Sequence, residues 1–263
     1  MAETDRFKHS TPALYDRYMG PLLFLPYATN VATRAALLKP KRILETAAGS
    51  GIVTAAIHAS VPDADIVATD INPGMLEFAG SRVRSKRVTF QTADAQNLPF
   101  GDGNFDLVVC QFGVMFFPDR VRANQEAYRV LSSGGSYLLV SFDSLERNLV
   151  PKTAGEAIAA LFPVDPPRYL ERGPFCYSDP EQIRGDLLKA GFAHVELETV
   201  GLSSRVNAHD AAQGIVLGSP FRAEIERRDP AALDRALQTV TQALEPWDGK
   251  TAPLSAHVAT ARK

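Results

Sequence analysis

The segment Ile43-Leu44-Glu45-Thr46-Ala47-Ala48-Gly49-Ser50-Gly51 decides the fold of this chain. It is a short apolar run that ends in an acid and turns through small residues. It continues into Ile52-Val53-Thr54-Ala55-Ala56-Ile57, a stretch typical of a helix. A strand, a glycine turn and a helix in this order direct backbone N–H groups and the positive helix end toward a ligand. Glycine permits a close approach to the backbone because it has no Cβ.

A second acid, Asp70, closes the next apolar run, Ile66-Val67-Ala68-Thr69. A carboxylate at the end of a second strand can accept hydrogen bonds from both hydroxyls of a ribose. Together, the glycine turn and Asp70 predict a site for a nucleoside-bearing cofactor. The alternative is a glycine turn that only packs a helix on a strand, since short patterns also occur without a ligand.

The glycine turn bears on which cofactor binds. A dinucleotide site has G-x-G-x-x-G directly after the strand, so that the pyrophosphate lies at the helix N-terminus. Here that pattern starts at Gly49 and has Thr54 in place of the third glycine. The arrangement acid-x-Ala-x-Gly-x-Gly resembles instead the first motif of class I S-adenosylmethionine-dependent methyltransferases. That family usually has Asp at the position of Glu45 and Gly at the position of Ala47.

Later motifs follow the order of the same family. Val88–Thr92 is predicted to be a third strand, and it leads into Ala93-Asp94-Ala95. The run 105–111 is apolar on both faces, as a central parallel strand is. Its continuation over 112–119 resembles the fourth motif of enzymes that methylate ubiquinone and menaquinone. The stretch 130–135, Val-Leu-Ser-Ser-Gly-Gly, resembles the family's Leu-Lys-Pro-Gly-Gly. Several motifs in the expected order are more specific than any one of them.

The resemblance implies a cofactor and the residues that bind it. Asp70 would hold the ribose, and Asp94 would accept from the adenine amino group while the next backbone N–H meets the ring. S-adenosyl-L-methionine, with S-adenosyl-L-homocysteine as product, would bind at Glu45, Ala47, Gly49, Gly51, Asp70, Ile71, Met75, Asp94, Ala95 and Gln111. The implied reaction is methyl transfer to a small organic acceptor. The cofactor supplies the hard chemistry, and the protein orients the acceptor.

Three segments outside the expected sheet should determine the acceptor. Residues 1–38 are predicted to form amphipathic helix packed over the cofactor cleft, and a plain helix-on-sheet cover is equally consistent with their spacing. Residues 143–179 and 203–250 are predicted to form a cap over the active site. A dimerisation surface is the competing use of 203–250. We expect Tyr15, Tyr18 and Phe116 to contact the acceptor. The catalytic base is unknown, and its candidates by region are Tyr15, Tyr18, Asp143, His209 and Asp210.

The order of elements predicts the architecture. Helices expected at about 51–60, 73–84, 119–131 and 180–190 alternate with strands at about 42–46, 65–70, 88–93, 106–111, 135–142, 195–200 and 256–261. Such alternation predicts right-handed crossovers and a parallel sheet. The resemblance adds the order 3-2-1-4-5-7-6 with strand 7 antiparallel. The expected fold is therefore α/β, a Rossmann-like seven-stranded sheet with helices on both faces and a helical cap. We expect a single domain over 1–263, with the cofactor-binding core at 39–142.

The composition indicates a globular enzyme. The chain has 28 Lys and Arg against 30 Asp and Glu, a net charge of -2, so no overall field favours nucleic acid or a membrane. Its histidines show no paired metal spacing. No apolar stretch approaches the ~20 residues of a membrane span, and the N-terminal residues do not resemble a signal peptide. We therefore expect a cytoplasmic protein that acts on a small molecule and not on nucleic acid, with a homodimer as one option.

Two other functions are open at this point. One is an NAD(P)-dependent oxidoreductase, which shares the strand, the turn and the acid of the second strand. Thr54 in place of glycine counts against it. The other is a non-catalytic protein that binds S-adenosylmethionine, since a fold does not dictate a function. The three acids Glu45, Asp70 and Asp94 favour the enzyme.

Overall fold

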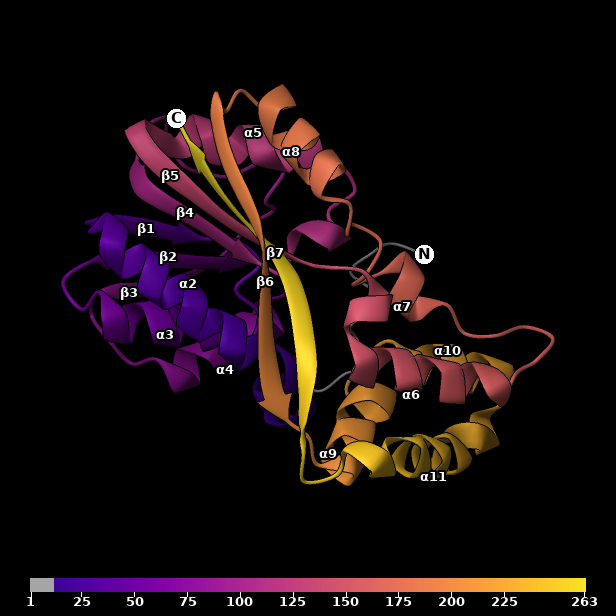
Figure 1. The fold of residues 1–263 in the computed structure, drawn as a ribbon. Coiled ribbons are helices and arrows are strands. Elements are labelled where there is room, and N and C mark those ends of the chain that lie inside the picture. Colours follow the sequence, from indigo (N-terminus) through magenta and orange to yellow (C-terminus); the bar gives the residue numbers. More distant parts are fainter. Residues whose placement is uncertain (1–11) are drawn as a thin grey trace. The chain divides into compact units, whose positions relative to one another are not determined.

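The computed structural model describes residues 12–263, which fall into two compact units. The sheet unit consists of residues 27–142, 177–200 and 256–263, and the helical unit of residues 12–26, 143–176 and 201–255 (Figure 1). The part of the predicted N-terminal cover that comprises residues 1–11 lies outside the described residues. That the chain acts as a single domain with a core at 39–142 stays a prediction.

A seven-stranded mixed sheet with the order β3-β2-β1-β4-β5-β7-β6 is the centre of the sheet unit. The pairs that join β3, β2, β1, β4 and β5 are parallel, and β7 runs antiparallel to β5. The predicted Rossmann-like fold and strand order are confirmed. The strands are β1 (Arg42–Glu45), β2 (Asp65–Asp70), β3 (Val88–Thr92), β4 (Phe105–Gln111), β5 (Leu131–Phe142), β6 (His194–Arg205) and β7 (Thr251–Arg262).

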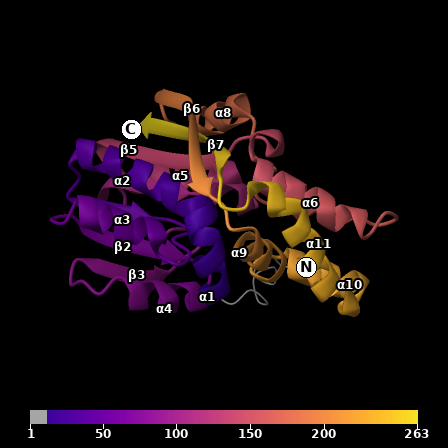
Figure 2. The ribbon, with the colours of Figure 1, turned by 60° about the horizontal axis from the view of Figure 1, so that its bottom comes forward.

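Helices cover both faces of this sheet (Figures 1 and 2). The chain moves one way along the sheet from β1 to β3 and the other way from β4 to β5. Right-handed crossovers therefore place α3 (Ile52–Ser60) and α4 (Pro73–Arg82) on one face and α5 (Arg120–Val130) on the opposite face. α8 (Pro180–Lys189) packs against α5. Because both faces are covered, the central strand β4 is buried along nearly its whole length.

The helices of the sheet unit begin at local sequence signals. Asn72 caps α4 by accepting a hydrogen bond from the N–H of Gly74, and Asp119 caps α5 by accepting from the N–H of Arg122. Asp179 caps α8 by accepting from the N–H of Glu181. These side chains satisfy N–H groups that have no partner within the first turn. The predicted helix starts therefore agree closely with the structure.

Three strands are longer than the sequence predicted. β5 begins at Leu131, where we expected a helix end and a glycine pair, and its register with β4 shifts between Phe105 and Leu107. β6 continues to Arg205, and β7 already begins at Thr251. The ends of strands depend on pairing with a neighbouring strand, which the periodicity of one segment does not reveal.

The helical unit contains two π-helices, Tyr15–Phe24 and Gln213–Leu217. They pack closely at Gly214, where a Cβ would lie 2.9 Å from the Cβ of Tyr18 and 3.0 Å from the Sδ of Met19. Within the predicted cap segment 203–250, the residues after β6 are mostly helical. The α-helices of this unit are α1 (Pro12–Leu14), α6 (Leu149–Ala160), α7 (Tyr169–Arg172), α9 (Ala208–Ala212), α10 (Phe221–Arg228) and α11 (Leu233–Leu244), while α2 (Leu25–Leu38) leads into the sheet unit.

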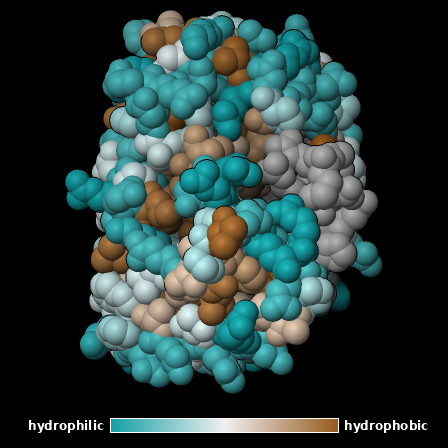
Figure 3. Space-filling model, turned by 90° about the vertical axis from the view of Figure 1, so that its right-hand side faces the viewer, coloured by the Kyte–Doolittle hydropathy of each residue, from teal (hydrophilic) through white to brown (hydrophobic). Residues whose placement is uncertain are grey.

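Large apolar side chains at the surface are scattered. Leu37, Ile71 and Val164 are the most exposed of them, at 78%, 53% and 97%. The face drawn in Figure 3 is largely hydrophilic, with apolar residues in small separate groups. Over the described residues, every helix is too short or too polar to cross a membrane.

Candidate cofactor site

The loop from Glu45 to Gly51 connects the carboxyl end of β1 to α3. Gly49 and Gly51 both have left-handed backbones, with φ of 54° and 78°. A Cβ on Gly51 would lie 2.8 Å from the Cβ of Ala79, so glycine is needed here for α3 and α4 to approach each other. A Cβ on Gly49 would meet no described atom within 4 Å beyond its chain neighbours. The loop is thus packed at Gly51 and open at Gly49, as a ligand-binding turn requires.

Ala47 occupies the position where the resembling family has glycine, and its backbone is left-handed, with φ of 53°. This conformation costs an L-residue about 1–2 kcal/mol. In the loop after β4, a Cβ on Gly113 would lie 2.4 Å from the Cβ of Ala47. The loops after β1 and β4 therefore contact each other here, and the missing side chain of Gly113 makes room for the Ala47 methyl group.

Asp70, at the end of β2, fastens the glycine loop. Its Oδ2 accepts a hydrogen bond from the N–H of Gly49 at 2.9 Å, and its Oδ1 accepts from the N–H of Asn72 at 2.8 Å. Burial raises the pKa of Asp70, although both hydrogen bonds act in the opposite direction. The sequence predicted a ribose acceptor at this position. The structure adds a positioning role, because Asp70 orients the loop that receives the ligand.

Glu45 is the most buried acid of the site, at 2% exposure. The hydroxyl of Thr54 on α3 donates to its Oε2 at 2.5 Å. Burial raises the pKa of Glu45 to about 8, and the negative charge of Asp70 adds to this rise. In the sequence, Thr54 stands out only as a substitute for a third glycine, and its contact with Glu45 was not predicted. The only sequence signal for this contact is the separation of nine residues between Glu45 and Thr54.

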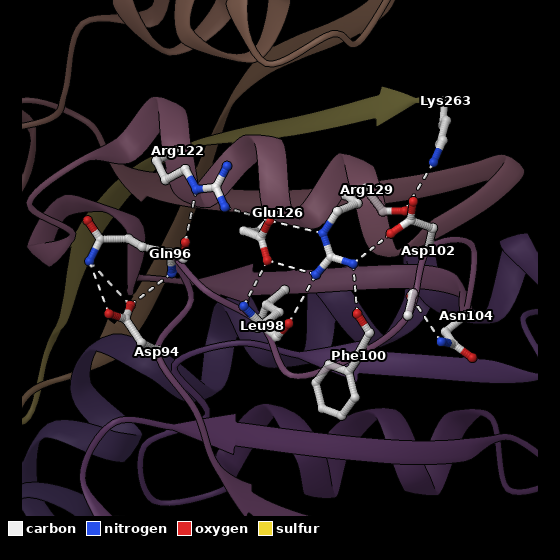
Figure 4. Close-up of polar contacts among 11 residues, drawn as sticks. Asp94, Gln96, Leu98, Phe100, Asp102, Asn104, Arg122, Glu126, Arg129 and Lys263 are labelled. Carbon is white, nitrogen blue, oxygen red and sulfur yellow. Dashed lines mark hydrogen bonds and ion pairs between the residues drawn. The ribbon is translucent and has the colours of Figure 1, made fainter.

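The loop after β3 presents Asp94. Its Oδ1 accepts from the backbone N–H of Gln96 at 2.8 Å and from the Gln96 side-chain amide at 3.2 Å (Figure 4). The carbonyl of that amide accepts from the N–H of Asp119 at 2.8 Å, at the start of α5. Gln96, which the sequence analysis did not single out, therefore links Asp94 to α5.

Three residues of α5 hold the segment from Gln96 to Phe100 in place (Figure 4). We call this group, Arg122, Glu126 and Arg129, the arginine clamp. Arg129 donates to the carbonyls of Phe100 at 2.7 Å and Leu98 at 3.0 Å. It also pairs with Glu126 at 2.8 Å, and Glu126 accepts from the N–H of Leu98 at 2.8 Å. The hydrogen bonds from Arg129 lower the pKa of Glu126. The clamp holds the loop that carries Asp94.

The structure places the other predicted cofactor residues at or beside the same strand ends. Ile71 follows Asp70 and is 53% exposed, whereas Met75 on α4 is buried. Ala95 follows Asp94 in its turn, and Gln111 ends β4 at 9% exposure. Their contacts with a cofactor stay predictions.

The acceptor candidates belong to different units. Phe116 lies in the short 3-10 helix Val114–Phe116 of the sheet unit, and Tyr15 and Tyr18 lie in the first π-helix of the helical unit. Among the candidate bases, Asp143 accepts from the hydroxyl of Ser255 at 2.7 Å and from the N–H of Ser144 at 2.6 Å. These bonds indicate a structural role for Asp143. His209 and Asp210 lie exposed on α9.

Comparisons with known proteins agree with this geometry. A family model described as a methyltransferase domain matches residues 44–139. The chain is 32% identical over 179 residues to a demethylmenaquinone methyltransferase of Thermus thermophilus, covering 63% of this chain and 80% of that protein. It is 33% identical over 183 residues to the ubiquinone/menaquinone biosynthesis C-methyltransferase UbiE of Methylobacterium nodulans, covering 62% of this chain and 70% of that protein. The solved structure of the YcgJ protein of Bacillus subtilis shares the fold, with a TM-score of 0.58, 19% identity, and coverage of 90% of this chain and 98% of that one.

The chain therefore belongs to the class I S-adenosylmethionine-dependent methyltransferases. It transfers a methyl group from S-adenosylmethionine to a small molecule. The prediction of an enzyme of this class is confirmed over the oxidoreductase alternative.

Proposed function

We propose that the cofactor lies against the open side of Gly49, between the carboxyl ends of β1, β2 and β3. The observation that carries this is the contrast between the packed Gly51 and the open Gly49 in one left-handed turn. Asp70 would accept from the ribose hydroxyls, and Asp94 from the adenine amino group. The exposed side chain of Ile71 would cover the adenine ring. The remaining contacts would come from Glu45, Ala47, Met75, Ala95 and Gln111.

Methyl transfer requires little proton transfer at the cofactor site itself. The sulfonium of S-adenosylmethionine activates its own methyl group. A bond forms between the acceptor atom and the methyl carbon while the S–CH₃ bond breaks, and the sulfur leaves as a neutral thioether. The acceptor's proton then passes to a base or to water. The protein's contribution is to orient the acceptor in line with the S–CH₃ bond and to exclude water.

We propose an acceptor of the kind that the two relatives' names specify, a quinone-type ring in its reduced form. The net charge of -2 supports a small molecule over nucleic acid. Tyr15, Tyr18 and Phe116 are the side chains that we propose for contact with the acceptor. The base would be Tyr15, Tyr18, His209 or Asp210. A cytoplasmic location and a homodimer are further parts of the proposal.

Calorimetric titration tests the cofactor site. We expect S-adenosylmethionine and S-adenosylhomocysteine to bind with dissociation constants of about 10 μM or below, equivalent to ~7 kcal/mol or more, and NAD and NADP not to bind. Binding of NAD without either S-adenosyl compound would contradict the proposal.

Incubation with S-adenosylmethionine and demethylmenaquinol, followed by mass spectrometry, then tests the acceptor. An unmethylated quinol beside a methylated simple phenol would change the acceptor and leave the cofactor site in place.

A further inference from the structure

The carboxyl group of Glu45 has an unusual environment for a buried acid. It is 2% exposed, and Thr54 is its only hydrogen-bond donor among the described residues. The charged or titratable group that faces it is Asp70 on β2, which is itself an acid. No described Lys, Arg or His forms an ion pair with either of the two carboxyl groups.

Such a pair of acids would favour a positively charged cofactor over a negatively charged one. A buried carboxylate without a cation is costly, so burial favours the neutral form of Glu45, and its pKa is raised to about 8. The pyrophosphate of a dinucleotide would bring more negative charge to this turn. S-adenosylmethionine brings a sulfonium and an ammonium group against a single carboxylate. Its net positive charge is one that the charged form of Glu45 would stabilise.

We propose that Glu45 is the charge selector of the cofactor site, neutral while the site is empty and ionised when a positively charged cofactor binds. This rests on the cofactor placement proposed above. On binding, the carboxyl O–H bond breaks, the proton passes to the solvent, and the carboxylate stays beside the cation. Thr54 serves both states, because a hydroxyl can accept from the neutral acid or donate to the carboxylate.

This selector makes cofactor affinity depend on pH. Below about pH 7, affinity for S-adenosylmethionine rises roughly tenfold per pH unit, because the ionised form of Glu45 becomes tenfold more populated. The rise ends near pH 8. Above it the cofactor's own ammonium, with an ordinary pKa of about 7.7–8.0 for an α-amino group, begins to lose its charge. A neutral analogue that keeps the adenosine part, 5′-methylthioadenosine, should show neither effect.

The test is calorimetry at pH 7 in buffers with different ionisation enthalpies, which counts the protons released on binding. We expect close to one proton for S-adenosylmethionine and close to none for 5′-methylthioadenosine. Release of a proton by both ligands would assign the titration to another group and overturn the selector. Failure of S-adenosylmethionine to bind at all would instead overturn the cofactor site, whereas binding without proton release would overturn the selector alone.

Two variants assign the proton to its residue. Glu45→Gln keeps a group that can bond to Thr54 but cannot ionise, so proton release and the pH dependence should both disappear. Thr54→Val removes the donor to the charged form and should move the rise in affinity to higher pH. Thr33→Val, at an exposed threonine on α2, is the matched control and should leave the profile unchanged. Retained binding of 5′-methylthioadenosine shows that each variant is folded. An unchanged profile in Thr54→Val, or continued proton release in Glu45→Gln, would refute the assignment.

Discussion

Two glutamates of the sheet unit are equally buried and have opposite electrostatics. Glu45 and Glu126 are both 2% exposed. The pKa of Glu126 is lowered by its hydrogen bonds with Arg129, with the charge of Arg122 as a smaller contribution. The pKa of Glu45 is raised to about 8 by burial, since its donor is a neutral hydroxyl and its charged neighbour is Asp70.

The difference teaches that burial alone does not decide the charge of an acid. An acid with a resident cation is part of the structure, and its charge is balanced before any ligand arrives. An acid without one is poised to meet a cation that the ligand brings, as perturbed groups at functional sites are. The arginine clamp and the cofactor loop are examples of these two cases within one sheet unit.

The largest expected effect comes from removing the resident cation. Arg129→Met leaves the buried carboxylate of Glu126 with less positive charge beside it. It also leaves the carbonyls of Leu98 and Phe100 without their N–H donor. We expect a loss of about 3–5 kcal/mol in the free energy of unfolding, measured by urea denaturation. Arg222→Met removes a helix-surface pair with Glu226 and should cost no more than about 0.5 kcal/mol. A loss below about 1 kcal/mol for Arg129→Met would contradict the clamp's role.

The next effect concerns the cofactor loop. Asp70→Ala removes the ribose acceptor and releases the N–H of Gly49. We expect S-adenosylmethionine to bind roughly tenfold or more weakly, since hydrogen bonds to a charged group contribute about 1.5–3 kcal/mol. Asp94→Ala should act in the same direction with a smaller effect. Asp65→Ala, at the exposed start of β2, serves as the control. Calorimetry that finds unchanged affinity in folded Asp70→Ala would leave Asp70 with a loop-capping role only.

A direct comparison of the two glutamates follows from their pKa shifts. Glu126→Gln should lose about 1.5–3 kcal/mol of stability at pH 7, where the charge is bonded to arginine. Glu45→Gln should instead gain stability at pH 7, because glutamine avoids the loss that the raised pKa of Glu45 imposes as pH rises. The pKa of Glu45 is above its unfolded value, so its stabilising contribution is present below about pH 4.5 and is lost as pH rises toward 8. Glu126 contributes in the opposite sense, and its contribution is lost as pH falls below its ordinary value.

Urea unfolding of the cofactor-free protein at pH 5, 7 and 8.5 measures this difference. Glu45→Gln should flatten the decline in stability between pH 5 and about 8, and saturating S-adenosylmethionine should do the same for the unaltered protein. Equal pH profiles for Glu45→Gln and the unaltered protein would show that Glu45 is ionised in the empty site.

The smallest effect concerns backbone strain at Ala47. Ala47→Gly relieves a left-handed conformation at the cost of chain entropy, so we expect a gain of up to about 1 kcal/mol in stability. Gly113→Ala should be destabilising because its Cβ would lie 2.4 Å from that of Ala47. In the double variant, which combines Ala47→Gly with Gly113→Ala, part of the stability lost through Gly113→Ala should be recovered. Strict additivity in a double-mutant cycle would show that the two loops are not coupled.

The sequence by itself determined the local features of this protein. The apolar run before Glu45, the glycine turn and the caps Asn72, Asp119 and Asp179 all act within a few residues of chain. Local periodicity and capping chemistry are sufficient to predict such elements. The motif order identified the family, and through it the sheet order and the cofactor.

Tertiary structure decided which groups meet across the fold. Thr54 reaches Glu45, Gly113 faces Ala47, and Arg129 reaches back to Leu98 and Phe100. The extension of β5 to Leu131 depends on its pairing with Phe105 of β4. Desolvation and hydrogen-bond partners come from residues distant along the chain, so the pKa of a buried acid follows from the packed structure. The motif placed an acid at Glu45. Only its packing against Thr54 and Asp70, with no cation paired to it in residues 12–263, made it a group that can exchange its proton.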